Sequence, residues 1–93
     1  MPWKEIDIEE LATTLGVDPI EVREKQKLIA LIIKKRKESK LSQTGLAKKI
    51  GVSQARVAQI ESGVGTSKIS FDILFNTLLA LGCEFKIIVR KAA

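Results

Sequence analysis

The sequence of 93 residues contains no histidine and no tyrosine, and Cys83 is its single cysteine. A lone cysteine cannot form an intrachain disulfide, and without histidine it leaves too few ligands for a structural zinc site. The absence of histidine also excludes histidine-based acid–base and triad catalysis. Because no other residues group into a catalytic site, we expect a protein that is not an enzyme and that needs no metal or cofactor.

Long apolar runs are also missing. The longest such run, LIALII at residues 28–33, is far short of the roughly 20 residues that a membrane helix needs. The N-terminal sequence MPWKEIDIEE is acidic, whereas a secretion signal would be basic and then apolar. Together with the lone cysteine, these features predict a cytoplasmic protein that does not associate with membranes.

The size and hydrophobic content of the chain fit one small globular domain. Its 93 residues can bury one modest core. The hydrophobic fraction of 45% is ordinary for a folded protein. We therefore predict a single domain that spans residues 1–93.

Charge is distributed unevenly along the chain. Residues 1–24 carry a net charge of −5, whereas residues 25–49 carry +8. A basic segment of this kind suggests a polyanionic partner such as nucleic acid. Taken alone, the segment is explained as well by a solvated helix face. Its position beside the motif described next favours the polyanion.

Apolar spacing and capping residues predict a mainly α protein of about five helices. Aspartate and serine residues precede most of these segments, and glycines follow several of them, as expected at helix starts and stops. The charged stretch 22–27 leaves open a break in the second helix. The expected helices are Ile6–Leu15, Pro19 to about Ser39, Gln43–Ile50, Gln54–Glu61 and Phe71–Leu81.

The third and fourth of these helices form a helix-turn-helix, at residues 42–62. Ser42 and Ser53 are placed to cap the two helices, and Gly51 can supply the positive φ that the tight turn between them requires. Two short capped helices with a turn of about three residues are typical of this motif. Apolar residues fall where the helices must pack: Leu46, Ala47, Ile50, Val52, Val57 and Ile60.

The C-terminal sequence CEFKIIVR, residues 83–90, has the alternation of a β-strand. Phe85, Ile87 and Val89 would share one face of it. A strand cannot satisfy its backbone alone, so we expect pairing with the same strand of a second subunit across a twofold axis. Pairing with residues 3–6 or with a partner protein remains an alternative.

Two sets of residues resemble known families. The pattern LSQ––LA––IGVS–––V––IE–G, residues 41–63, resembles the Xre or lambda-repressor-like regulators. LGVDPIEVREKQKLIALI, SQARVAQIESG and SFDILFNTLLALGCEFKIIVR, within residues 15–91, resemble HigA-type antitoxins. One departure is Gly45, where the family often has a charged helix-forming residue. Glycine in a helix costs about 0.5–1 kcal/mol relative to alanine.

The resemblance implies a helical domain that is dimeric on DNA, represses its own operon and neutralises a toxin. It also implies that Arg36 and Glu61 form a structural ion pair and that Gln43 contacts the DNA backbone. The acidic N-terminal segment could contact a basic toxin, or it could be a packed helix with a solvated acidic face.

The second helix of a helix-turn-helix enters the major groove with its N-terminal part. Glutamine can pair with adenine, arginine with guanine, and alanine can contact a thymine methyl. The candidates for base contact are Gln54, Ala55, Arg56 and Gln59. The candidates for contact with the DNA backbone are Gln43, Ser53, Thr66, Ser67, Lys68 and Lys48, with Lys48 and Lys49 as electrostatic helpers.

These observations predict a sequence-specific, homodimeric repressor that binds double-stranded DNA and serves as the antitoxin of a toxin–antitoxin pair. The first alternative is a stand-alone Xre-type regulator without a toxin partner. The second is an interaction module whose helix-turn-helix no longer binds DNA.

Overall fold

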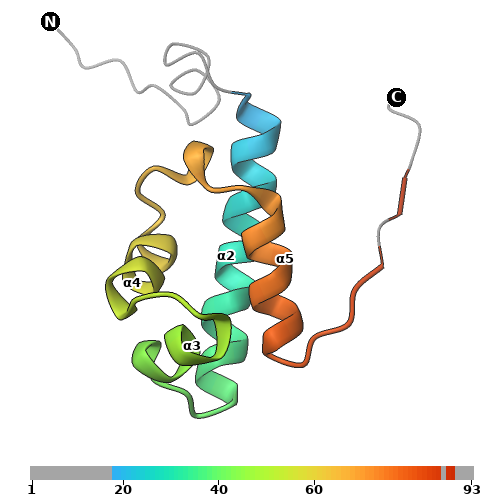
Figure 1. The fold of residues 1–93 in the computed structure, drawn as a ribbon. Coiled ribbons are helices and arrows are strands. Elements are labelled where there is room, and N and C mark those ends of the chain that lie inside the picture. Colours follow the sequence, from blue (N-terminus) through green and yellow to red (C-terminus); the bar gives the residue numbers. More distant parts are fainter. Residues whose placement is uncertain (1–17, 87, 90–93) are drawn as a thin grey trace, which may run out of the picture.

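The computed structural model describes residues 18–86, 88 and 89. This part of the chain contains four α-helices and one short 3-10 helix. Figure 1 shows α2 and α5 side by side, with α4 beside α2, and α3 packs against α4 and α5. The expected helix at residues 6–15 lies outside the described residues. The elements are α2 (Pro19–Glu38), α3 (Gln43–Ile50), α4 (Gln54–Ser62), η1 (Thr66–Lys68) and α5 (Phe71–Ala80).

Helix α2 begins where the sequence predicts. The Asp18 carboxylate accepts a hydrogen bond from the Ile20 amide at 2.9 Å, and Pro19 occupies the first helical position. The helix is continuous through residues 22–27, so the possible break does not occur. Lys25 and Lys27 lie within 3.0 Å of glutamates one turn earlier in the helix. Such pairs favour the helix over the whole charged stretch.

The helix-turn-helix has the predicted caps and turn. The hydroxyl of Ser42 accepts a hydrogen bond from the Gly45 amide at 2.9 Å, and that of Ser53 accepts one from the Arg56 amide at 3.1 Å. Gly51 has φ +74°, a conformation that costs glycine little and other residues more. The turn therefore sets the direction in which α4 leaves α3.

One apolar core joins the four helices. Of the positions predicted to pack in the helix-turn-helix, four are buried, and Ile50 and Val52 lie partly buried against them. No helix among the described residues is long and apolar enough to cross a membrane. The buried apolar residues are Ile29, Ile32, Leu46, Ala47, Val57, Ile60, Ile69, Leu74 and Leu78.

The strand predicted at residues 83–90 is not formed among the residues of this segment that the structure describes. The chain leaves the end of α5 in an extended course away from the bundle (Figure 1). Among the described residues no strand pairs with it to supply the hydrogen bonds that a strand requires. Phe85 packs instead on α5, with its ring centroid 4.9 Å from that of Phe75. Val89 is 90% exposed, and Ile87 lies outside the described residues.

Candidate nucleic-acid interface

The first two turns of α4 carry the side chains that the sequence singles out for base contact. Gln54, Ala55 and Gln59 are exposed, and Arg56 is half-buried. The Arg56 guanidinium donates a hydrogen bond to the side-chain oxygen of Gln59 at 2.9 Å. This bond links two polar groups one turn apart on the outer side of the helix.

The opposite side of α4 is fixed in the core. Val57 and Ile60 are each 2% exposed. They are three residues apart, so both lie on one face of the helix. Gln59 lies on the side of the helix opposite this buried face, whereas Gln54 and the half-buried Arg56 flank it. The packing of α4 therefore determines which of its side chains a ligand can reach.

A buried ion pair connects the end of α4 with α2. Arg36 Nε donates to Glu61 Oε2 at 2.7 Å, and Arg36 Nη2 donates to Glu61 Oε1 at 2.9 Å, in the two-pronged geometry typical of strong pairs. Arg36 Nη1 also donates to the backbone oxygen of Leu41 at 2.9 Å. The side chains of Arg36 and Glu61 are 12% and 7% exposed.

The ion pair shifts the pKa of both side chains. The hydrogen bond to Glu61 raises the pKa of Arg36, against the opposing effect of burial. Burial alone would raise the pKa of Glu61, but the hydrogen bonds from Arg36 and Gln43 and the nearby positive charges outweigh it and lower that pKa. Both side chains are therefore charged at neutral pH.

Gln43 extends this network to α4. Its side-chain nitrogen donates to Glu61 Oε1 at 3.2 Å, and its side-chain oxygen accepts a hydrogen bond from Gln54 at 2.8 Å. The sequence indicates separate DNA contacts for Gln43 and Gln54, and these bonds were not predicted. A signal for the bond between them was present in the sequence, because each glutamine is the first residue of one helix of the helix-turn-helix.

The η1 turn contains the three remaining candidates for backbone contact that follow α4. Thr66 is buried, and its hydroxyl donates to the Gly63 oxygen at 2.5 Å. Ser67 and Lys68 are exposed. Lys25 of α2 reaches the Ser67 backbone oxygen at 3.3 Å. Sequence reasoning placed Lys25 only in the basic run, although it lies four and seven residues before the buried Ile29 and Ile32.

Lys48 and Lys49 are exposed in the last turn of α3. Ser53 is exposed as well, and its hydroxyl already accepts the capping bond from Arg56. Among the described residues no histidine, cysteine, aspartate or glutamate cluster could hold a metal ion. The structure therefore brings together amide and guanidinium groups around the start of α4.

Residues 32–88 match the model of the family HTH_3, described as helix-turn-helix. This stretch is more than half of the chain and includes α3, α4, η1 and α5. No curated protein and no solved structure matches the chain. The exposed polar start of α4, its capped partner helix and this family match agree with one another. The chain belongs to the Xre-type helix-turn-helix family of DNA-binding transcriptional regulators.

Proposed function

We propose that this protein, as one domain, is a sequence-specific repressor that reads base edges in the DNA major groove with the start of α4. The observation that carries the proposal is that Val57 and Ile60 hold one face of α4 in the core, while Gln54 and Gln59 are exposed and Arg56 is half-buried at the edge of that face. A rigidly held helix with exposed amide and guanidinium groups matches the donors and acceptors that bases present in that groove.

In this proposal Arg56 pairs with guanine and Gln54 with adenine, while Ala55 contacts a thymine methyl and Gln59 a neighbouring base. The bond between Arg56 and Gln59 orients the guanidinium before DNA arrives. Pre-ordering of this kind reduces the entropy that binding would otherwise cost.

Backbone phosphates would lie beside the starts of α3 and α4 and beside η1. The amides of Gln43 and Ser53 lie where helix N-termini favour anions. Ser67 and Lys68 offer an exposed hydroxyl and ammonium, and the buried Thr66 offers only its backbone. Lys48 and Lys49 add positive charge without a fixed contact.

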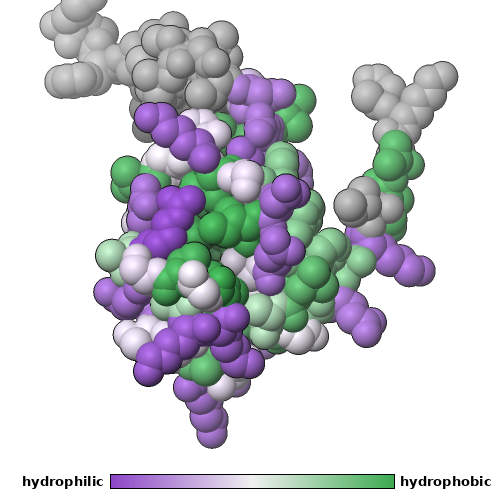
Figure 2. All heavy atoms as spheres, viewed as in Figure 1, coloured by the Kyte–Doolittle hydropathy of each residue, from purple (hydrophilic) through white to green (hydrophobic). Residues whose placement is uncertain are grey.

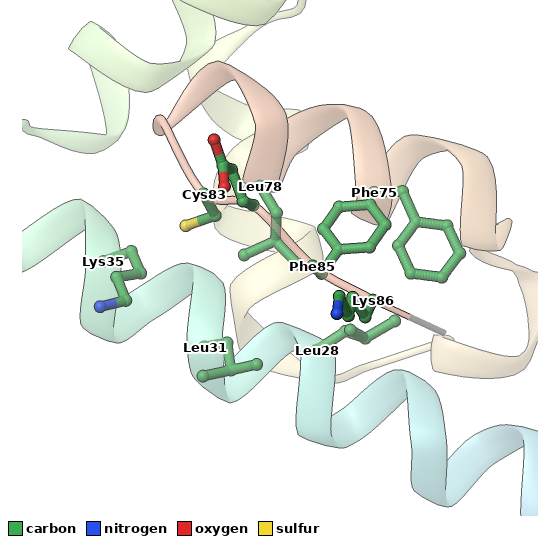
Figure 3. A pocket seen from close by; sticks show the side chains of 9 residues that line it. Leu28, Leu31, Lys35, Phe75, Leu78, Cys83, Phe85 and Lys86 are labelled. Carbon is green, nitrogen blue, oxygen red and sulfur yellow. The ribbon is translucent and has the colours of Figure 1, made fainter. Parts of the chain in front are cut away.

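We also propose a homodimer in which the segment after α5 pairs with its copy across a twofold axis. Hydrophobic residues gather over the lower part of α5 and the chain that leaves it (Figure 2). Here Leu28 and Leu31 of α2 face Phe75 and Leu78 of α5 across a cavity of about 240 Å³, which Phe85 partly covers (Figure 3). The extended, unpaired segment beyond Phe85 favours a second copy as the occupant of this side.

The antitoxin role is a finer proposal that rests on the resemblance in residues 15–91. In it the dimer represses its own operon and neutralises a toxin encoded beside it. A stand-alone regulator is the alternative. Co-expression with the product of a neighbouring small reading frame would separate the two, since an antitoxin forms a stoichiometric complex and relieves growth arrest.

The test of DNA reading is fluorescence anisotropy with DNA from the region upstream of the gene, and with shuffled DNA of equal length. We expect the native fragment to bind at least about a hundredfold tighter, a lower bound on the roughly 10³–10⁷-fold preference typical of specific readers. Arg56→Ala should remove most of this margin, whereas Lys27→Ala, on the exposed side of α2, should not. If a dimer neutralises about eight phosphates, the logarithm of affinity should fall with a slope near −7 against the logarithm of salt concentration.

Equal binding of native and shuffled DNA would contradict repression of the upstream region by this protein alone. A margin unchanged by Arg56→Ala would contradict base reading by α4. Salt dependence close to zero would favour the interaction module that no longer binds DNA.

A further inference from the structure

The side chain of Lys25 is buried, although lysine ammonium groups normally remain in water. It is 3% exposed, whereas that of Lys27, half a turn further along α2, is 63% exposed. Both residues pair with a glutamate of the same helix, so their charges are matched in the same way. A lysine is held inside a small protein only where its ammonium group finds several partners.

Three elements supply the partners of Lys25. Its Nζ atom lies 2.8 Å from Glu21 Oε1 on α2 and donates a hydrogen bond to the Ser67 backbone oxygen of η1 at 3.3 Å. It also lies 5.1 Å from the ring centroid of Phe71 at the start of α5, within the range of a cation–π contact. One ammonium group therefore ties η1 to the N-terminal part of α2, where Figure 1 shows the two side by side.

The η1 turn is held at its ends by buried side chains and at its middle by the hydrogen bond from Lys25. Thr66 and Ile69 are buried and anchor the ends. The Ile69 amide donates to Thr66 and the Lys68 amide to Gly65, at 3.1 and 2.9 Å. The Ser67 carbonyl, between them, is held by Lys25. With this carbonyl drawn toward α2, the side chains of Ser67 and Lys68 remain exposed.

We propose that Lys25 is a positioning residue for DNA binding, which holds the η1 turn so that Ser67 and Lys68 meet one backbone phosphate. The proposal rests on the function proposed above. Glu21 offsets the charge of Lys25, and burial keeps its ammonium away from solvent. Lys25 therefore acts through the turn and not as a cation that faces DNA.

The test compares Lys25→Met, Lys27→Met, Lys68→Ala and the double variant Lys25→Met/Lys68→Ala. Methionine keeps the length and helix preference of lysine and can lie against Phe71. Anisotropy is recorded over a range of salt with native and shuffled DNA. Loss of one phosphate contact reduces the steepness of the salt dependence by about 1 per subunit and weakens binding to all sequences alike.

We expect Lys25→Met to reproduce the reduced salt slope of Lys68→Ala, with the ratio of native to shuffled affinity unchanged. The double variant should bind as Lys68→Ala alone does, because both changes remove the same contact. Lys27→Met should retain the wild-type slope. A wild-type slope in Lys25→Met, or fully additive losses in the double variant, would overturn the positioning role and leave Lys25 a stabilising residue only.

Far-UV circular dichroism first establishes that Lys25→Met is folded. If Lys25→Met is unfolded, the variant Glu21→Gln tests the proposal in its place, because the Glu21 side chain is 45% exposed and its substitution spares the core. Without its carboxylate partner the Lys25 ammonium is held less firmly, so the salt dependence of DNA affinity should become less steep, as expected for Lys25→Met. An unchanged salt slope and affinity in Glu21→Gln would overturn the proposal. Failure of the proposed function is distinct, since the wild-type protein would then show no preference for native DNA.

Discussion

At the residue scale, the pair of Arg36 and Glu61 decides how firmly the end of α4 is held. Replacing Arg36 by methionine leaves the Glu61 carboxylate in a site where it is 7% exposed. A buried charge without its counter-ion is costly, so we expect the free energy of unfolding to fall by about 3 kcal/mol. Urea unfolding at neutral pH measures this loss.

The control for Arg36→Met is Lys27→Met, because Lys27 pairs with Glu24 on the exposed side of α2, 3.0 Å away. Surface pairs of this kind contribute less than about 1 kcal/mol. Equal losses in the two variants would show that Arg36 contributes no more than a surface charge.

The lowered pKa of Glu61 predicts how stability depends on acid. A carboxyl whose pKa is lower in the folded state stabilises the fold above its unfolded pKa, about 4.3. That contribution is lost as the pH falls through the lower, folded value. Glu61→Gln should therefore be less stable than wild type at pH 7 and should lose less stability between about pH 5 and pH 3.

Urea unfolding over this pH range measures the effect, with Glu24→Gln as the control. The Glu24 side chain is 50% exposed in its pair with Lys27, so its removal should leave the acid dependence nearly as in wild type. If Glu61→Gln lost as much stability in acid as wild type does, Glu61 would not be a source of the acid dependence.

At the element scale, the turn between α3 and α4 depends on one left-handed residue. Gly51 has φ +74°, and an added Cβ would meet no atom within 4 Å, so only backbone strain opposes a side chain there. We expect Gly51→Ala to lower the free energy of unfolding by about 1–2 kcal/mol. Thermal or urea unfolding measures the change.

Gly45→Ala is the matched control, since Gly45 lies inside α3. Alanine is favoured there by about 0.5–1 kcal/mol, but its Cβ would lie 3.2 Å from Leu41 Cδ2. These effects oppose each other, so the variant should stay within about 1 kcal/mol of wild type. If Gly51→Ala is as stable as Gly45→Ala, the left-handed turn is not the constraint.

The helices of this fold were largely predictable because their signals are local. Asp18, Ser42 and Ser53 each cap the helix that the sequence assigned to them. The spacing of apolar residues likewise identified Leu46 and Val57 as core positions. Capping and periodicity act within a few residues, so neither requires knowledge of distant contacts.

Side-chain partners that come from different elements were harder to predict. The bond between Gln43 and Gln54 joins two helices, and Lys25 contacts a turn 42 residues away. Charge alone placed Lys25 in the basic segment that suggests a polyanionic partner, whereas its register with Ile29 and Ile32 indicates the buried side. Contacts of this kind depend on how the helices pack, which no local pattern specifies.

At the scale of the whole molecule, the segment 83–90 marks the limit of local reasoning. Its alternation of apolar and charged residues is typical of a strand, yet pairing depends on a second strand, and no described part of the chain provides one. Phe85 packs on Phe75, whereas Val89 is 90% exposed. The alternation thus shows that the segment could pair as a strand, but it does not predict the conformation of the segment without a second strand.

The proposed dimer makes a prediction at this same scale. Val89 is 90% exposed in the subunit, so Val89→Asp should leave the subunit folded. In a twofold pairing of the segment, it would place two carboxylates near each other and remove apolar contact. We expect light scattering to give twice the chain mass for wild type and a single chain mass for Val89→Asp.

Val64→Asp is the control for this experiment, because Val64 is also exposed, at 72%, but lies in the loop after α4. It should remain dimeric. A monomeric wild type would refute the homodimer, and a dimeric Val89→Asp would place the interface elsewhere. The DNA-binding consequence follows from symmetry, since a dimer presents two α4 helices to the halves of a palindrome. Val89→Asp should therefore bind a single half-site as wild type does and lose the additional affinity that the full palindrome provides.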